Sequence, residues 1–282
     1  MTNFDLRAAA RLFLLLTLWA ACFWPVYPPL VETWLSHSDH SHGLLVPFIS
    51  LAFVWQKRAE LMSTSSSTAP FGVVILFASL AFYLLSLLGG IAVTSRMMMV
   101  FSLAGLVLFQ YGKPIFRLVA FPVFFLLFMI PVPVSIIGKI SMPLQMFATI
   151  VSEHIIRAFS IPVYREGNML YFVQTQLEVA DACSGIRSIT ALLMLSTVFV
   201  YISSLPWTRR SILLASAIPI ALAANILRVA GTGILAHFYG ARVAQGFLHE
   251  FSGMAVFAFG LLLLYLVFRV LEHRQPLESD KK

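Results

Sequence analysis

The sequence predicts an all-α, polytopic transmembrane bundle of about eight helices, with an interfacial helix and a small extracytoplasmic hairpin. Two observations lead to this fold class. Hydrophobic residues make up 60% of the 282 residues and charged residues only 11%, and the mean hydropathy is +0.90, which is far from the balance of a soluble domain. The basic residues that give a net charge of +7 lie in short clusters between apolar runs, as membrane-orienting charges do, and this pattern speaks against a nucleic-acid partner.

Apolar runs of roughly 20 residues are the length that a bilayer-spanning helix needs. The run 43–56 is short for a full crossing and 94–111 is marginal. The predicted spans are residues 11–30, 43–56, 71–90, 94–111, 115–133, 185–205, 210–229 and 250–271.

Every second connection between these spans is basic, which predicts an even number of spans with both termini in the cytoplasm. The clusters are Arg7 with Arg11, Lys57 with Arg58, Lys113 with Arg117, Arg209 with Arg210, and Arg269, Arg274, Lys281 and Lys282 at the end. The first apolar run has no small-residue cleavage site, so we expect it to be retained as a span.

The connections complete a single domain over residues 1–282. Residues 57–70 are expected to form a cytoplasmic linker and residues 272–282 a short cytoplasmic tail. The segment 134–182 is expected outside the membrane: its first part as an amphipathic helix at the interface, and its second part, around Glu166-Gly167-Asn168, as a hairpin.

Three reactive residue types fall at one membrane face in this topology. Cys183 begins the sixth span, Arg228 ends the seventh and His249 begins the eighth. A helix N-terminus and nearby cations, here Arg187, favour a thiolate, an imidazole transfers protons, and a guanidinium holds an oxyanion. Together they supply the parts of an acyl-transfer site.

Each of these residues alone has an ordinary explanation. A cysteine at a span end is usually a small packing residue, as we expect of Cys22, and an arginine there usually snorkels to the interface. Ser184 and Ser252 lie near the site without the G-x-S-x-G pattern of a nucleophilic serine. It is the coincidence of three types on one face that indicates a site.

A cluster of His37, Asp39, His40 and His42 could bind a metal, but its spacing matches no known site and favours a solvated loop. No metal or other cofactor is expected. The twelve acidic residues are all expected in loops or at span ends, which disfavours a transporter with a carboxylate at the membrane midplane.

The motifs in residues 165–168 (Arg-Glu-Gly-Asn) and 177–188, with Cys183 at its centre, resemble those of the exosortase/archaeosortase family of membrane transpeptidase-like proteases. Residues 41–47 resemble its early motif, residues 225–228 its arginine motif, and His249-Glu250 falls where its histidine is expected. The resemblance covers most of the chain from about 35 to 270.

The resemblance implies that Cys183 is the nucleophile, Arg228 the electrostatic or substrate-orienting group, and His249 the acid/base. It implies action, at the outer face of a bacterial inner membrane, on exported proteins that carry a C-terminal sorting signal: a Pro-Glu-Pro-like motif, a transmembrane helix and a basic tail. Some relatives carry a fused domain linked to exopolysaccharide systems, so a separate partner protein is an open expectation beside membrane lipid. The supporting residues are Arg187, Ser184, Asn225, His42 and Glu250.

Two alternatives to the enzyme remain. One is a non-enzymatic membrane component that carries polysaccharide or lipid intermediates for export, in which Cys183 would tolerate replacement. The other is a metal or solute transporter that uses the histidines of residues 37–42.

Overall fold

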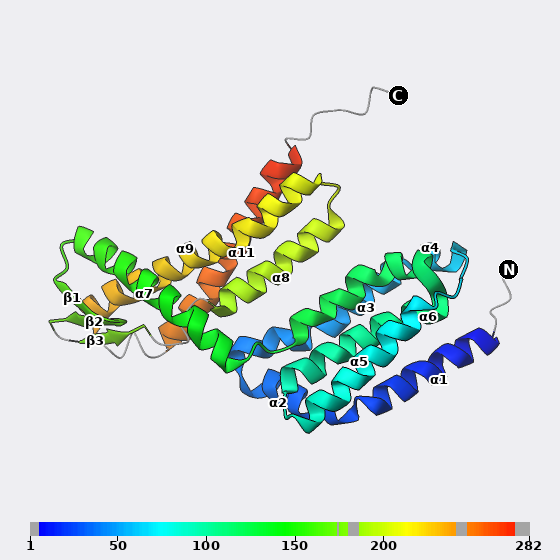
Figure 1. Ribbon diagram of the computed structural model, residues 1–282. Helices are drawn as coiled ribbons and strands as arrows, with labels where there is room; N and C mark the ends of the chain where they lie inside the picture. The colour runs from blue at the N-terminus through cyan, green and yellow to red at the C-terminus, as the bar shows by residue number, and fades with distance from the viewer. Residues whose placement is uncertain (1–5, 174, 180–185, 241–246, 274–282) are drawn as a thin grey trace. The chain divides into compact units, whose positions relative to one another are not determined.

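The computed structural model describes residues 6–173, 175–179, 186–240 and 247–273 (Figure 1). It confirms the all-α polytopic class. The described chain divides into two compact units, unit 1 up to Pro133 and unit 2 from Val134 onward, and each is described by itself.

Unit 1 contains the helices of the first half of the chain. They are α1 (Leu6–Cys22), η1 (Trp24–Val26), α2 (Tyr27–Ser36), η2 (Ser38–Leu44), α3 (Val46–Gln56), α4 (Arg58–Ser63), α5 (Phe71–Leu88), α6 (Ala92–Phe125) and η3 (Leu126–Met129). Helices α5 and α6 pack with their backbones in near contact: a Cβ atom at Gly105 would lie 2.6 Å from the Leu76 nitrogen. Only small residues allow two membrane helices to come this close.

Helix α6 is two antiparallel legs joined at Gly112, which has φ 78° and ψ 179°. The rings of Phe101 and Phe124 have centroids 6.0 Å apart, although 23 residues of a straight helix would separate them by about 34 Å. Pro114 follows the break and cannot continue the first leg's hydrogen bonding. The legs therefore correspond to the predicted spans 94–111 and 115–133.

The first predicted span, 11–30, is a bent pair of helices, Ala10–Cys22 and Trp24–Ser36, at 52° to each other. Pro25 sits in the 3-10 turn η1 between them, so the hydrogen bonding of one continuous helix is interrupted there. The predicted span 43–56 contains only the 11 residues of α3, about 16 Å of helix.

The described part of unit 2 contains three long helices, one shorter apolar helix and a small sheet. Its elements are α7 (Val134–Ala158), β1 (Val163–Glu166), β2 (Met169–Phe172), β3 (Gln176–Glu178), α8 (Ile186–Ile202), α9 (Trp207–Tyr239) and α11 (Phe247–His273). The strands form an antiparallel sheet in the order β1-β2-β3. The predicted hairpin is confirmed, with Gly167 at φ 60° in its turn, and β3 adds a strand that the sequence pattern did not predict.

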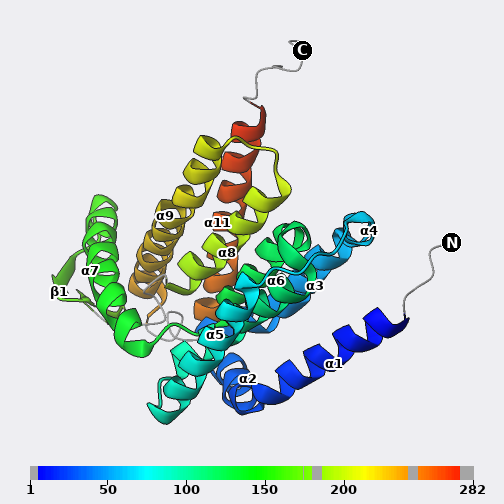
Figure 2. The same cartoon turned by 45° about the vertical axis from the view of Figure 1, so that its right-hand side comes forward.

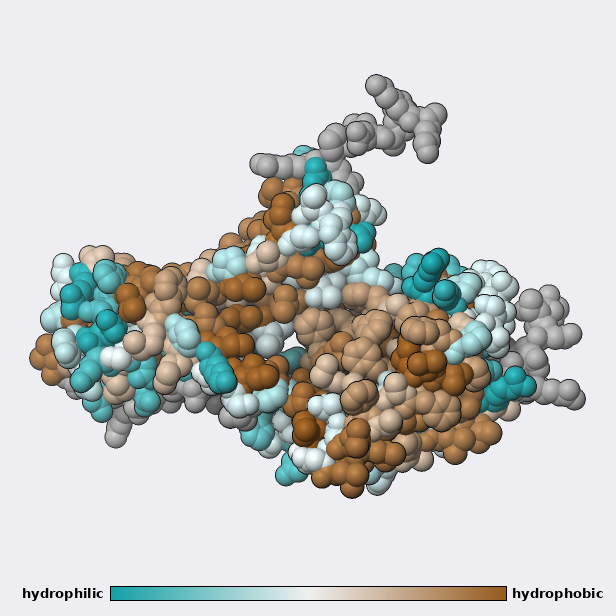
Figure 3. All heavy atoms as spheres, viewed as in Figure 1, coloured by the Kyte–Doolittle hydropathy of each residue, from teal (hydrophilic) through white to brown (hydrophobic). Residues whose placement is uncertain are grey.

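The predicted count of eight spans is not confirmed. Among the described residues, five helices are long and apolar enough to cross a membrane, or six with the bent pair counted as one span. In this count the two legs of α6 are one helix, and α8 is left out because it has only 17 residues. Helix α7 is among the helices long and apolar enough to cross a membrane, although the sequence predicted an interfacial helix there. Figure 3 shows apolar side chains over the helices and polar ones gathered around the sheet.

Candidate active site

Three helices of unit 2 meet at Gly260. A Cβ atom there would lie 3.1 Å from Leu192 of α8 and 3.8 Å from Ala224 of α9. Leu192 is fully buried, in a cluster with Leu213 of α9 and Leu264 of α11. Figure 2 shows α8, α9 and α11 lying together, with α8 and α11 beginning at the same end.

Three of the predicted site residues are displaced from this crossing in one direction. Arg187 precedes Leu192 by five residues, Arg228 follows Ala224 by four, and His249 precedes Gly260 by eleven. Since α9 runs antiparallel to its two neighbours, all three shifts lead to the end where α8 and α11 begin. At 1.5 Å per residue, these positions lie about 7, 6 and 16 Å from the crossing.

The Arg228 guanidinium lies against the first turns of α11. A Cβ atom at Gly253 would be 3.5 Å from Nη2 and 3.6 Å from Cζ of Arg228. Gly253 is four residues after His249, which is one helical turn, so the guanidinium and the backbone of His249 belong to the same region. The guanidinium thus packs against the backbone of α11 at this glycine, within ordinary van der Waals distance of the position that a Cβ atom would take.

Arg228 is half-buried, and its neighbour Asn225 is 3% exposed. The backbone of α9 next to Arg228 is fixed from the other side, since the Ser152 hydroxyl of α7 donates a hydrogen bond of 3.2 Å to the Ile226 carbonyl. The arginine motif of residues 225–228 is therefore held between α7 and α11.

The sheet packs beside Arg228 as well. Leu170, Phe172 and Val179 form a buried cluster with Val229 and Ala230 of α9. The sheet approaches α9 at Gly233, where a Cβ atom would lie 3.1 Å from the Phe172 ring.

Asn168 forms two hydrogen bonds with Val179, where the chain leaves this sheet. The backbone N–H of Val179 donates to the Asn168 carbonyl at 2.9 Å, and the Asn168 side-chain amide donates to the Val179 carbonyl at 3.3 Å. Val179 is 1% exposed and precedes Cys183 by four residues. The Arg-Glu-Gly-Asn motif thus fixes the start of the segment that carries the predicted nucleophile.

Cys183 and Ser184 lie outside the described residues. His249 and Glu250 belong to the first turn of α11, but their side chains are outside the described part as well. Arg187 is exposed in the first turn of α8. The structure brings together the helix segments of Arg187, Arg228 and His249, and it tests no contact between the reactive side chains.

His42 belongs to unit 1, in η2. Burial lowers the pKa of His42 and the neighbouring His40 lowers it further, while a hydrogen bond from the imidazole to the Phe128 backbone works in the opposite direction. Burial also lowers the pKa of His40. In the described ranges, no three or more His, Cys, Asp or Glu side chains are placed so that they could hold one metal ion.

Two charged residues escaped the sequence-based prediction. Arg96 is 9% exposed and lines a pocket in unit 1. It lies inside the predicted span 94–111, and ionisable residues within spans are usually functional. The sequence therefore contained a signal for this residue. Glu153 is 8% exposed and pairs with Arg157 at 2.7 Å and Arg165 at 2.9 Å. No sequence signal pointed to the second pair, which joins α7 to β1.

A family model described as transmembrane exosortase (Exosortase_EpsH) matches residues 34–266 of the chain. The matched range includes η2, the sheet, α8, α9, α11 as far as residue 266, and every predicted site residue. Comparisons with curated proteins and with solved structures find no match.

Proposed function

The chain belongs to the transmembrane exosortase family, and from this premise we propose that it is a membrane-embedded cysteine transpeptidase or peptidase. Its substrates are exported proteins with a C-terminal sorting signal, consisting of a Pro-Glu-Pro-like motif, a transmembrane helix and a basic tail. Cys183 is the nucleophile, Arg228 the oxyanion-stabilising group and His249 the acid/base.

The observation that carries the proposal is the position of the Arg228 guanidinium, 3.5 Å from the point where a Cβ atom would lie at Gly253. One turn of α11 separates this contact from His249. An arginine that served only to anchor α9 would extend toward lipid headgroups, whereas this one turns toward the neighbouring helix and is half-buried.

The nucleophile is supported by two fixed points on either side of it. Val179 is pinned by Asn168 and packs with Val229, next to Arg228, and α8 begins at Ile186. A chain of four residues spans at most about 14 Å, a length that is compatible with the proposed position of the nucleophile beside the arginine. The N-terminus of α8 and Arg187 favour the thiolate form of a nearby cysteine.

The proposed reaction begins when the Cys183 thiolate adds to the scissile carbonyl. Arg228 donates hydrogen bonds to the resulting oxyanion. His249 transfers a proton to the amine, which leaves as the C–N bond breaks and a thioester forms. Water or an acceptor amine then attacks the thioester and His249 accepts its proton. The C–S bond breaks, the Cys183 thiolate leaves, and the hydrolysis or transfer product forms.

The chain offers a matched control for the nucleophile, because its two cysteines are Cys22 and Cys183. We expect Cys183→Ala to abolish processing of an exported reporter that carries the sorting signal, and Cys22→Ala, at an exposed thiol, to leave it unchanged. Arg228→Lys should slow processing by roughly a hundredfold or more, as loss of an oxyanion donor does. Mobility of the reporter on a denaturing gel measures each rate.

Normal processing in the Cys183→Ala strain would refute the proposed nucleophile. It would favour the non-enzymatic carrier, for which Cys183 can be replaced. A thioester trapped between Cys183 and the reporter, detected by mass and released by hydroxylamine, would separate an enzyme from a carrier directly.

A further inference from the structure

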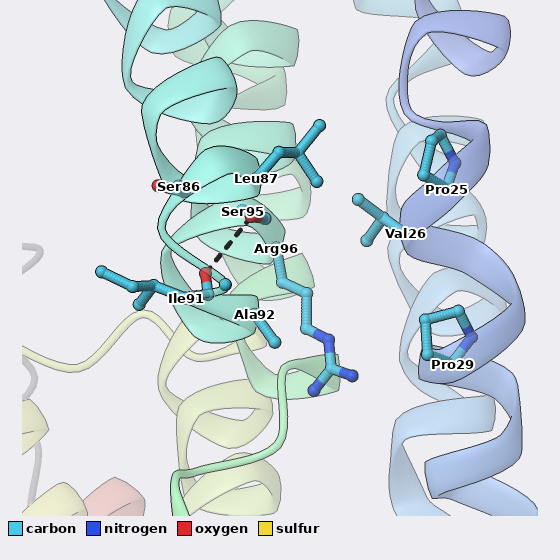
Figure 4. A pocket seen from close by; sticks show the side chains of 10 residues that line it. Pro25, Val26, Pro29, Ser86, Leu87, Ile91, Ala92, Ser95 and Arg96 are labelled. Atoms are coloured by element: carbon cyan, nitrogen blue, oxygen red, sulfur yellow. Dashed lines mark hydrogen bonds between the residues drawn. The ribbon is translucent and has the colours of Figure 1, made fainter.

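A pocket of about 210 Å³ lies in unit 1, between α2 and the turn that joins α5 to α6. Figure 4 shows Arg96 extending from α6 into the space between these elements, opposite Pro29 and Val26. The lining residues are Pro25, Val26, Pro29, Ser86, Leu87, Gly90, Ile91, Ala92, Ser95 and Arg96.

Arg96 is nine-tenths buried, with 9% of its surface exposed. None of the ion pairs found between described side chains includes it, and none of the hydrogen bonds drawn in Figure 4 reaches its guanidinium. His40 lies close enough to Arg96 for the two to interact electrostatically, but an imidazole is neutral or positively charged and supplies no compensating negative charge. A buried guanidinium in such a site needs an anion.

The other polar groups around the pocket are already engaged with one another. The carbonyls of Ser86 and Leu87 accept the N–H groups of Ile91 and Gly90 at 2.9 and 3.2 Å, and the Ser95 hydroxyl donates to the Ile91 carbonyl at 3.2 Å. Helix α6 begins at Ala92, one turn before Arg96, and its positive N-terminal end adds to the attraction for an anion.

The walls and rim of the pocket are apolar. Leu87, Leu88 and Ile91 are 42%, 87% and 55% exposed where α5 ends, and Trp24, 69% exposed, precedes Pro25. Exposed aliphatic side chains and a tryptophan are typical of the boundary between hydrocarbon and headgroups. An anion that binds here is therefore next to surface suited to an acyl chain.

We propose that this pocket binds the phosphate group of an anionic membrane phospholipid. Arg96 contacts the phosphate, and the acyl chains lie along the exposed apolar surface of α5. The Arg96 guanidinium pairs with the phosphodiester oxygens in the fork geometry that arginine favours. A phospholipid neutralises the Arg96 guanidinium and also covers the apolar surface beside it, whereas free phosphate does only the first. The site is independent of Cys183, Arg228 and His249.

The test is titration of the detergent-purified full chain with phosphatidylglycerol, with the bound lipid counted by native mass spectrometry. We expect Arg96→Gln to weaken binding roughly tenfold, the loss expected for hydrogen bonds to a charged group. Ala92→Phe should weaken it as well, because it fills the pocket from an exposed position of the lining and keeps the guanidinium. Arg117→Gln, at an exposed arginine on the second leg of α6, is the matched control and should bind as wild type does.

Two further titrations separate the sources of the anion. Diacylglycerol, which lacks phosphate, should not bind at this site, and millimolar inorganic phosphate should not displace the lipid. Wild-type binding by Arg96→Gln, or displacement by inorganic phosphate alone, would overturn the proposal. So would an acidic peptide that binds through Arg96 where phosphatidylglycerol does not. Circular dichroism of each variant confirms that the helices remain folded.

Discussion

Glu153 links the sheet to the membrane helix α7 of unit 2 through two ion pairs. Its two carboxylate oxygens accept from Arg157 on α7 at 2.7 Å and from Arg165 on β1 at 2.9 Å. The Arg157 side chain also donates to the Val163 carbonyl, at 3.1 Å from Nη2. One buried carboxylate thus orders both the end of α7 and the first strand.

We expect Glu153→Gln to lower the free energy of unfolding by about 1–2 kcal/mol. The loss is smaller than for a fully buried pair, because 57% of the Arg157 side chain and 27% of the Arg165 side chain are exposed and water screens both. Denaturation in detergent, followed by circular dichroism, measures the change.

Glu60→Gln is the control for this substitution. Glu60 pairs with Lys57 at 2.7 Å, but its side chain is 54% exposed, so the same change there should cost less than about 0.5 kcal/mol. Equal effects at the two positions would contradict the structural role of Glu153.

Residue-scale details were the part of the site that the sequence could not supply. The choice of Cys183, Arg228 and His249 rests on motifs and span ends and stays a prediction. The contact of Arg228 with Gly253, and the pairing of Asn168 with Val179, depend on which faces of the helices and strands meet. Those faces are set by packing between segments that are distant in the chain, and a local pattern does not encode them.

At the scale of elements, Gly260 fixes the spacing of the three helices that carry the candidate site. A side chain there would press on Leu192, 3.1 Å from its Cβ position. We expect Gly260→Leu to destabilise unit 2 by about 1–3 kcal/mol through overpacking. It should also slow substrate processing, because it moves α11, and His249 with it, away from Arg228.

Gly231 provides the comparison, since nothing lies within 4 Å of its Cβ position in α9. Gly231→Leu should leave stability within about 0.5 kcal/mol of wild type or raise it slightly, as replacement of a helical glycine does. Unfolding and reporter processing, measured side by side for both variants, check the prediction. Normal processing by Gly260→Leu would show that the spacing of these helices does not matter.

Hydropathy predicted the long helices well and the short ones poorly. The break between residues 111 and 115 was readable, because Lys113 and Pro114 interrupt the apolar run where Gly112 turns the chain. The run 43–56 was not, because its first residues form the 3-10 turn η2 and only 11 residues of α3 remain helical. An average over a window does not separate these two conformations.

At the scale of the whole molecule, the basic clusters predict which side each loop faces. We expect the sheet outside the cytoplasmic membrane and the linker 57–70 inside. Single cysteines at Glu166 and Ser66, both exposed, test this in a chain that carries Cys22→Ala and Cys183→Ala. A membrane-impermeant maleimide should label Glu166→Cys in intact spheroplasts, and Ser66→Cys only after lysis.

Labelling of Ser66→Cys in intact spheroplasts would reverse the orientation and place the site in the cytoplasm. Such a result would exclude exported substrates at the outer face, although Cys183 could still be a nucleophile. Equal labelling of both positions before and after lysis would instead indicate leaky spheroplasts, which a cytoplasmic marker enzyme detects.

Because the pairing of Asn168 with Val179 belongs to the small sheet, we expect this part of the proposed enzyme to unfold more easily than its membrane helices. Three strands of three or four residues are marginal structures by themselves, whereas membrane helices retain their backbone hydrogen bonds in lipid. Mild denaturant should open the sheet first, as a separate cooperative unit, and release the chain that leads to Cys183. Inactivation would then precede any fall in helix content.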